Sequence, residues 1–335
     1  MELMYGESMD RNVTAQLLEN IPHNKLGVLG DFCTDVYWEL NPEPGERSIE
    51  TGLVTTSVST ARYSPGGAGN IIANLRGVGM KKIPCFGAVG TDPFGLWLHH
   101  ELTGNAPEYA QTLLKIGRKD YHTPVYCKPL LNDVEQPRID LGNTPLTDAE
   151  SRELLSQTAA LLPELKVLIV NEQIRNGIHT PVFRTGFAQL VKEFSGKVKF
   201  VFDGRDYLDA YPGVTLKINA HAASKLAFGK EDRHPLESGK AILERDGEEL
   251  VITDGENGCY VFEHHRVTHI PAIRYSGMVD TVGAGDSFTA GFAYALASGA
   301  TMVTAAEFGT CCSAVTIRKL NQTGAPSPQE IMELL

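Results

Sequence analysis

Short apolar runs rich in valine and isoleucine recur along this chain, and stretches with helical periodicity separate each run from the next. Each run ends in a small or polar residue. This alternation constrains the fold most, because strands that are apolar throughout need helices on both faces of their sheet. It predicts a three-layer α/β/α sandwich around a mainly parallel sheet, with strands at 25–31, 82–90, 166–172, 197–203, 216–219 and 250–253.

The residues that end these strands are the first candidates for chemistry. In open parallel sheets, ligands bind in the crevice outside the carboxyl ends of the strands. The candidates at these ends are Asp31, Glu172, Asp203, Asn219 and Thr253. For Asp203, a cap of its loop is the alternative to contact with a phosphate.

Two stretches, 32–65 and 121–141, break the pattern with alternating polar and β-forming residues and no helical period. Both leave and rejoin the main pattern, which predicts a small separate β-sheet that forms a lid over one edge of the large domain. A closed lid excludes water from a reaction. Residues 1–24 contain one amphipathic helical pattern, so we expect a helical extension before a domain of residues 25–335.

Charge and cysteine content narrow the class of function. The chain has 335 residues with 30 basic and 41 acidic side chains, a formal net charge of −11. This excess of negative charge gives no general attraction to nucleic acid or to an anionic membrane. The six cysteines show no CxxC spacing, and no apolar run approaches the ~18 residues of a membrane span. We expect a cytoplasmic protein with reduced thiols, which binds an anion only at a local positive site.

Residues 280–299, DTVGAGDSFTAGFAYALASG, form the most informative stretch. Apolar residues recur with helical spacing from Phe288, and Gly299 follows as a stop, which predicts a helix from about 286 to 298. Small residues before this helix allow backbone N–H groups to converge on an anion, where the helix dipole adds positive charge. These residues are Gly283, Ala284 and Gly285.

Asp286 adds a carboxylate to this predicted anion site. Such a placement suits a base that takes the proton from a hydroxyl attacking a γ-phosphate. The alternative is that Asp286 caps the helix and the glycines only shape a turn, although Thr289 does not complete a capping box. The sequence has no Walker A loop and no GxGxxG turn after a strand, which argues against P-loop and dinucleotide chemistry.

The segment 280–286, DTVGAGD, resembles the DTxGAGD signature of the ribokinase-like PfkB carbohydrate kinases. Residues 66–70, GGAGN, resemble the GGxxN element of that family, and residues 253–258 resemble its TxGxxG nucleotide loop. The similarity extends over residues 25–330. It implies a ribokinase-like fold and phosphoryl transfer from ATP, with Mg²⁺, to a hydroxyl of a sugar or sugar phosphate.

Three segments are similar to the heptose 7-phosphate kinases within this family. They are Gly30 and Asp31 followed by DVYW at 35–38, the RID strand at 138–140, and the ending at 319–329. This similarity implies an acceptor that carries a phosphate, which needs a cation in so acidic a chain. The candidates are Lys128, Arg138 and Arg205, the last standing near the place where those kinases carry a lysine. The alternative is that all three are solvated surface charges.

The family resemblance also implies a set of binding residues. The sugar would be bound by Asp31, Asp35, Gly66, Gly67, Asn70 and Arg138, and ATP by Asn219, Thr253, Gly255 and Gly258. Further expectations are a monovalent cation such as K⁺ near Asp280 and a homodimer formed through the lid. The alternatives for Asp31, Asp35 and Asn70 are a turn residue, a lid-surface charge and a helix cap.

One position departs from the family pattern. The resemblance places a glutamate three residues after Asn219, where it organises magnesium, but the chain has Ala222. Either Glu172 or Glu231 replaces this glutamate in organising magnesium, or Mg²⁺ is held through phosphates and water alone. The departure leaves open an inactive regulatory or binding relative. A separate alternative within the same family is a kinase for a nucleoside or another small alcohol.

Overall fold

A ten-stranded β-sheet forms the middle layer of the protein in the computed structural model, which describes residues 2–6, 9–21, 25–104, 112–142, 144–229, 233–320 and 324–335. In spatial order the strands are β1 (Glu2–Tyr5), β15 (Arg266–Ile270), β14 (Cys259–Glu263), β13 (Leu250–Thr253), β12 (Thr215–Asn219), β11 (Lys199–Asp203), β10 (Val167–Asn171), β2 (Leu26–Gly30), β5 (Cys85–Gly90) and β6 (Leu113–Ile116). Strand β14 runs antiparallel to both neighbours, and the other pairs are parallel. The predicted, mainly parallel sheet is confirmed.

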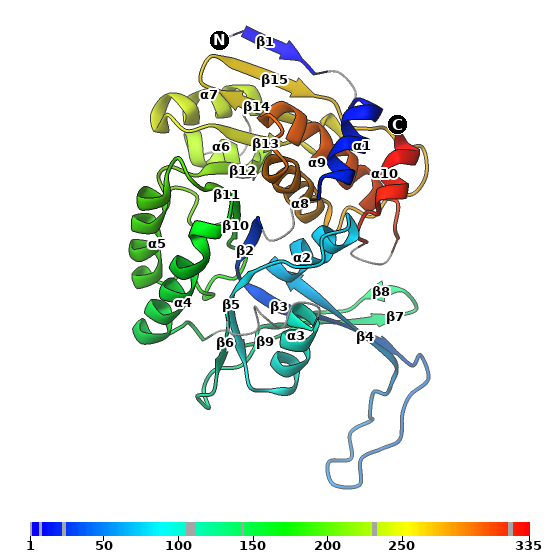
Figure 1. Ribbon diagram of the computed structural model, residues 1–335. Helices are drawn as coiled ribbons and strands as arrows, with labels where there is room; N and C mark the ends of the chain where they lie inside the picture. Colours follow the sequence, from blue (N-terminus) through cyan, green and yellow to red (C-terminus); the bar gives the residue numbers. More distant parts are fainter. Residues whose placement is uncertain are drawn as a thin grey trace.

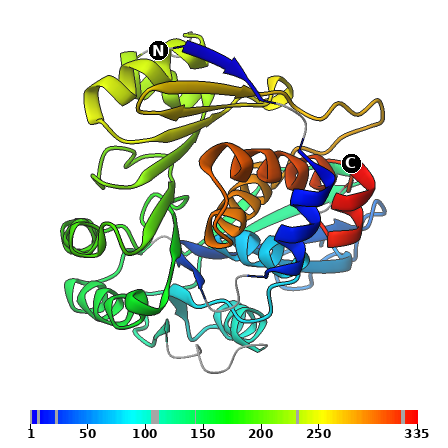
Figure 2. The same cartoon turned by 45° about the horizontal axis from the view of Figure 1, so that its top comes forward.

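Helices cover both faces of this sheet (Figures 1 and 2). One face carries α1 (Arg11–Glu19), α2 (Ala68–Gly77), α8 (Ala284–Ala297), α9 (Met302–Thr316) and α10 (Pro328–Leu334). The other carries α4 (Asp148–Leu161), α5 (Pro181–Phe194), α6 (Ala220–Phe228) and α7 (Pro235–Asp246). Each face of the sheet packs into its own buried apolar cluster. Within β10, Ile169 belongs to the cluster under α2 and α8, whereas Leu168 and Val170 belong to the cluster under α4 and α5. Burial of both faces explains why the strands read as continuous apolar runs.

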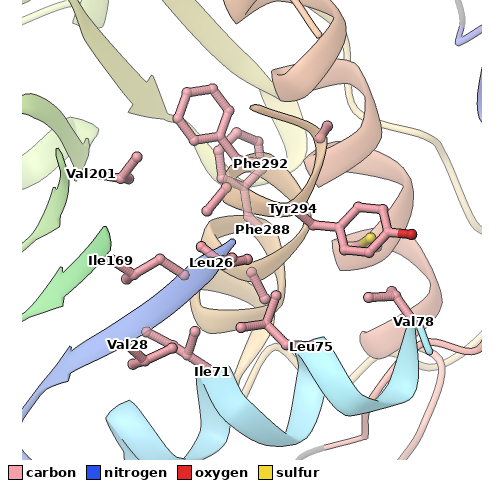
Figure 3. Packing of buried hydrophobic residues seen from close by; sticks show 14 of the residues in the cluster. Leu26, Val28, Ile71, Leu75, Val78, Ile169, Val201, Phe288, Phe292 and Tyr294 are labelled. Carbon is pink, nitrogen blue, oxygen red and sulfur yellow. The ribbon is translucent and has the colours of Figure 1, made fainter. Parts of the chain in front are cut away.

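The packing of α2 and α8 against the sheet positions the carboxyl ends of the strands. Leu26 and Val28 of β2 lie next to Ile71 and Leu75 of α2 in the same buried cluster as Phe288 of α8 (Figure 3). All of these side chains are at most 4% exposed. Cores packed this tightly resist displacement, so the first turns of α2 and α8 are held at fixed positions above the sheet edge.

A second, five-stranded sheet, called the small sheet below, lies beside the main body (Figure 1). It contains β4 (Val58–Gly67), β3 (Phe32–Leu40), β7 (Val125–Leu131), β8 (Val134–Glu135) and β9 (Ile139–Leu141). Helix α3 (Pro93–Thr103) contacts β3 and β4. Strand β3 continues from β2 with only Asp31 between them, and β4 leads directly into α2. Two connections of the small sheet to the main body therefore lie next to the end of β2 and the start of α2, and two others lead from β6 to β7 and from β9 to α4.

The amino-terminal residues differ from the helical extension that the sequence analysis expects. They contain the helix α1, but residues Glu2–Tyr5 also form strand β1, which pairs with β15 at the edge of the main sheet. A strand of four residues is too short to show a periodicity of its own. All six cysteines are buried and free, as expected. Among the described residues, no helix has both the length and the apolar character needed to cross a membrane.

Candidate active site

Helix α8 begins at Ala284, two residues before the start that its periodicity predicts. Gly283 caps it with a left-handed backbone (φ 79°), which glycine adopts without strain. Asp286 therefore lies in the first turn and is not the cap. Ala284 donates its N–H to the carbonyl of Thr281, whereas the N–H groups of Gly283 and Gly285 have no acceptor within the described ranges. Two N–H groups of the predicted anion turn thus remain available at the positive end of the helix dipole.

Two amide side chains hold the carboxylate of Asp286. Nδ2 of Asn70, in the first turn of α2, donates to Oδ2 at 2.6 Å, and Nε2 of Gln173, after β10, donates to Oδ1 at 3.0 Å. Burial of the carboxyl and the charge of Asp203 raise the pKa of Asp286 to about 6, while both amides and Lys217 oppose the rise. A carboxylate with this pKa is ionised at neutral pH and is a stronger base than an ordinary aspartate.

A buried ion pair lies beside the first turn of α8. Nζ of Lys217, on β12, is 3.1 Å from Oδ2 of Asp203, and the hydroxyl of Thr289 donates to the same oxygen at 2.7 Å. The side chains of Lys217 and Asp203 are only 6% and 13% exposed. A Cβ atom at Gly285 would lie 3.4 Å from Nζ of Lys217. The ammonium group is therefore close to the place where the anion turn would hold a negative group.

A pocket of about 670 Å³ opens next to this turn. Small-molecule sites commonly measure roughly 300–1,000 Å³, so the pocket is large enough for a nucleotide. Ala284 and Gly285 line one part of it, and α9 contributes Thr310, Ser313 and Ala314. The remaining lining comes mainly from the loop after β13 and the segment after β15.

Three of the four residues predicted to bind ATP line this pocket, namely Thr253, Gly255 and Gly258. Gly258 has a φ of 94°, and a Cβ atom there would overlap the carbonyl oxygen of Ile270, so only glycine fits. The fourth, Asn219, is not among the lining residues. Its side chain caps α6 by accepting the N–H of Ala222 at 2.8 Å.

Asp31, predicted to contact the sugar, lies buried at the end of β2 and holds a neighbouring loop. The residue is 1% exposed, and its carboxylate accepts three backbone N–H groups. Oδ2 accepts those of Gln173 and Ile174, both at 2.9 Å, and Oδ1 accepts that of Ile178 at 2.8 Å. The carboxylate thus anchors the loop after β10, and this loop carries the amide that holds Asp286.

The small sheet brings other predicted residues close to this loop. Gly66 of β4 lies opposite Cys33 of β3, and a Cβ atom at Gly66 would meet the Cys33 sulfur and a carboxylate oxygen of Asp35. Gly67 has a φ of 58° and caps α2. Burial raises the pKa of Asp35, and the charge of Lys128 opposes this. Gly66 therefore allows β4 to pass close to the carboxylate of Asp35, whereas a Cβ atom at Gly67 would overlap the carbonyl oxygen of Asp31.

The three candidate cations for an acceptor phosphate have different surroundings. Nζ of Lys128 lies 3.5 Å from Oδ1 of Asp35. Arg138 donates twice to the carboxylate of Asp140, at 2.6 and 2.7 Å. Arg205 is exposed, and its guanidinium forms no ion pair with any residue that the structure describes. Among the residues that the structure describes, Lys128 and Arg138 have a carboxylate partner and Arg205 has none.

Glu172, one expected substitute for the missing family glutamate, is fully buried. Its Oε2 accepts the backbone N–H groups of Arg205 and Asp206, both at 2.8 Å, so it anchors the loop after β11. The other, Glu231, lies outside the described residues. No group of three or more His, Cys, Asp or Glu side chains suitable for a metal was found in the described part of the chain. Asp280, expected near a monovalent cation, accepts the N–H of Val282 at 3.0 Å.

Sequence reasoning missed two residues of this site, Lys217 and Gln173. The signal for Lys217 was a single charged residue inside an otherwise apolar strand, TLKIN. Gln173 follows the end of β10 by two residues, but nothing in the sequence shows that its side chain turns toward Asp286.

Comparisons with known proteins bear on the family of this chain and on its fold. The family described as pfkB family carbohydrate kinase matches residues 121–330. The bifunctional protein HldE of Shewanella piezotolerans is 26% identical over 315 residues, which cover 93% of this chain and 63% of that protein. HldE of Helicobacter hepaticus is 25% identical, with 93% and 64% covered. The chain thus spans less than two thirds of the length of these curated relatives.

Solved structures with the same fold include two ribokinases. The Arabidopsis thaliana ribokinase complexed with ribose and ATP aligns with a TM-score of 0.70 at 19% identity, covering 93% of this chain and 98% of that one. The Thermotoga maritima ribokinase aligns with a TM-score of 0.67 at 19% identity, covering 92% and 98%. At these identities the likeness establishes the ribokinase-like fold.

Proposed function

Because this chain belongs to the pfkB family of carbohydrate kinases, we propose that it transfers the γ-phosphoryl group of ATP to a hydroxyl of a sugar or sugar phosphate. The observation that carries the proposal is the position of Asp286. Its carboxylate lies in the first turn of α8, next to two available N–H groups and beside a pocket of about 670 Å³. A base at an anion-binding turn is the arrangement that phosphoryl transfer to an alcohol requires.

In the proposed reaction Asp286 accepts the proton of the acceptor hydroxyl. The hydroxyl oxygen forms a bond to the γ-phosphorus, and the bond between that phosphorus and the bridging oxygen breaks, so that ADP leaves. The N–H groups of Gly283 and Gly285 and the ammonium of Lys217 would stabilise the negative charge of the group in transfer. Asn70 and Gln173 keep the carboxylate of Asp286 in one orientation.

The pocket supports ATP as the phosphoryl donor. Thr253, Gly255 and Gly258 line the same pocket as Ala284 and Gly285. A nucleotide would therefore find continuous space for both its adenosine end and its phosphate end. Magnesium bound with the nucleotide would neutralise phosphate charge, and it often keeps phosphate and water ligands. That coordination needs no glutamate at Ala222, and a K⁺ site near Asp280 remains part of the proposal.

The acceptor would lie between the small sheet and the first turn of α2. Asp35 and Asn70 have the polar groups that bind sugar hydroxyls, and a phosphorylated acceptor would meet the exposed guanidinium of Arg205. Exposed apolar side chains on the small sheet, Val134, Ile139 and Leu141, support a homodimer formed through the lid. Light scattering would measure that oligomeric state.

The direct test measures ADP release with ATP, Mg²⁺ and a panel of free sugars, sugar phosphates and nucleosides. We expect turnover with a sugar or sugar phosphate, and a loss of about 100- to 10,000-fold in kcat for Asp286→Asn. The matched control is Asp206→Asn, since Asp206 is an exposed aspartate on the same sheet edge. Full turnover by Asp286→Asn would remove the proposed base.

A regulatory or binding role is the second candidate, and Ala222 is the observation that favours it. In that case ATP or a sugar would raise the melting temperature, but no acceptor in the panel would give ADP. Turnover with nucleosides alone would assign the chain to nucleoside kinases instead.

A further inference from the structure

The loop at residues 254–258, called the nucleotide loop below, forms one wall of the 670 Å³ pocket. Asp254 donates its N–H to the carbonyl of Gly258 at 2.7 Å, Asn257 to that of Asp254 at 3.0 Å and Gly258 to that of Gly255 at 3.1 Å. Nδ2 of Asn257 also donates to Oδ2 of Asp254 at 3.0 Å. These four bonds set the shape of the loop, and the pairing of Thr253 with Cys259 holds its two ends. None of the four attaches the middle of the loop to the body of the protein.

A side chain from β15 supplies such an external attachment. The ring nitrogen Nε2 of His269 lies 2.8 Å from the carbonyl oxygen of Asn257, which lines the pocket. A carbonyl oxygen only accepts hydrogen bonds, so Nε2 carries the hydrogen and His269 is the donor. This bond connects the nucleotide loop to the hairpin formed by β14 and β15.

Aromatic rings on both neighbouring strands hold the imidazole of His269. The ring of Tyr260, on β14, is 4.5 Å away between centroids. The ring of Tyr5, on β1, meets it edge-on at 5.8 Å and 85°. Strand β1 pairs in register with β15, with Tyr5 opposite His269, and the N–H of Gly6 donates to the carbonyl of His269 at 2.8 Å. The amino-terminal strand therefore fixes both the backbone and the ring of His269.

We propose that β1 and His269 brace the nucleotide loop, so that His269 is a positioning residue for ATP. The inference rests on the proposed function, because it assumes that the pocket binds ATP. His269 would not touch the nucleotide. It would hold the carbonyl of Asn257, and with it the pocket wall, in the orientation that ATP needs.

The test compares His269→Leu with His269→Gln, whose side-chain amide can donate a hydrogen bond in place of Nε2. Removal of one hydrogen bond predicts a Kd and a KM for ATP that are about 2- to 10-fold higher in His269→Leu. The kcat and the KM for the acceptor stay unchanged, and His269→Gln recovers the affinity for ATP. Tyr5→Ala, which removes the ring from β1, moves the KM for ATP in the same direction by a smaller factor.

The matched control is His265→Leu, since His265 is an exposed histidine at the far end of the same hairpin. It should leave the KM for ATP unchanged. If the wild type binds ATP and His269→Leu binds it equally well, the brace is refuted and the proposed function stands. Equal losses in kcat and in both KM values would mean general loosening of the fold, which also refutes positioning. If the wild type shows no ATP binding by calorimetry, the proposed function and this inference both fall.

Discussion

The substitution Asp286→Asn should make the protein more stable at neutral pH while it removes turnover. The pKa of the folded-state carboxyl is raised from 3.8 to about 6, first by burial and then by the charge of Asp203. Ionisation of this group therefore costs the folded state more than the unfolded state. The penalty is absent well below pH 3.8, grows between the two pKa values and is complete above pH 6. A shift of one pKa unit corresponds to about 1.4 kcal/mol, so the free-energy penalty of ionising Asp286 in the folded state is about 3 kcal/mol at pH 8 and about 1 kcal/mol at pH 4.5.

An asparagine at this position carries no charge, so it avoids that penalty at every pH. Urea unfolding of the wild type and of Asp286→Asn at pH 8 and pH 4.5 measures the difference. We expect the variant to gain up to about 3 kcal/mol at pH 8 and about a third of that at pH 4.5. One amide of the pair that holds Asp286 must turn over to face the new side chain, which reduces the gain. A variant that is equally destabilised at both pH values would refute the reasoning.

Three further substitutions test neighbouring contacts. Gln173→Leu removes a hydrogen bond that favours the ionised form of Asp286, so the acid limb of the kcat/KM profile should move up by about 0.5 to 1 pH unit, and an unmoved limb would contradict this. Lys217→Met leaves Asp203 buried without its cation and should cost about 3–5 kcal/mol in urea unfolding, with kcat lowered about 100-fold; adding Asp203→Asn should restore stability but not kcat. Asp31→Asn should lower the free energy of unfolding by about 3 kcal/mol. A change in the KM for the acceptor alone would instead mean that Asp31 binds the sugar.

The fold and the turn of small residues before α8 were predictable because their signals are local. Each buried strand carries its own apolar run, and the small residues at 283–285 precede a helical period that is visible in the sequence. The exact start of α8 was not predictable in the same way. Only the left-handed backbone of Gly283 shows that the helix begins at Ala284.

The parts that sequence reasoning missed depend on contacts between distant segments. Lys217 is paired because β12 lies beside β11 in a register that brings it next to Asp203. Asp31 could bind a sugar hydroxyl or a backbone N–H with the same atoms, and only the path of the loop after β10 decides between them. The pairing of β1 with β15 joins residues 2–5 to residues 266–269, which are far apart in the sequence, so no local pattern could reveal it.

Two of the joints between the small sheet and the main body have a consequence for protein engineering. The chain passes from β2 into the small sheet at Asp31 and from β4 into α2 at Gly67, and Phe32 pairs with Gly67 between these joints. Both joints lie near Asn70, whose amide holds Asp286. In chimeras that exchange small sheets among relatives, the chimera should show the acceptor selectivity of the protein that donated the small sheet. Such grafts require that both joints be kept from the recipient, so that the base and its amide partners stay aligned.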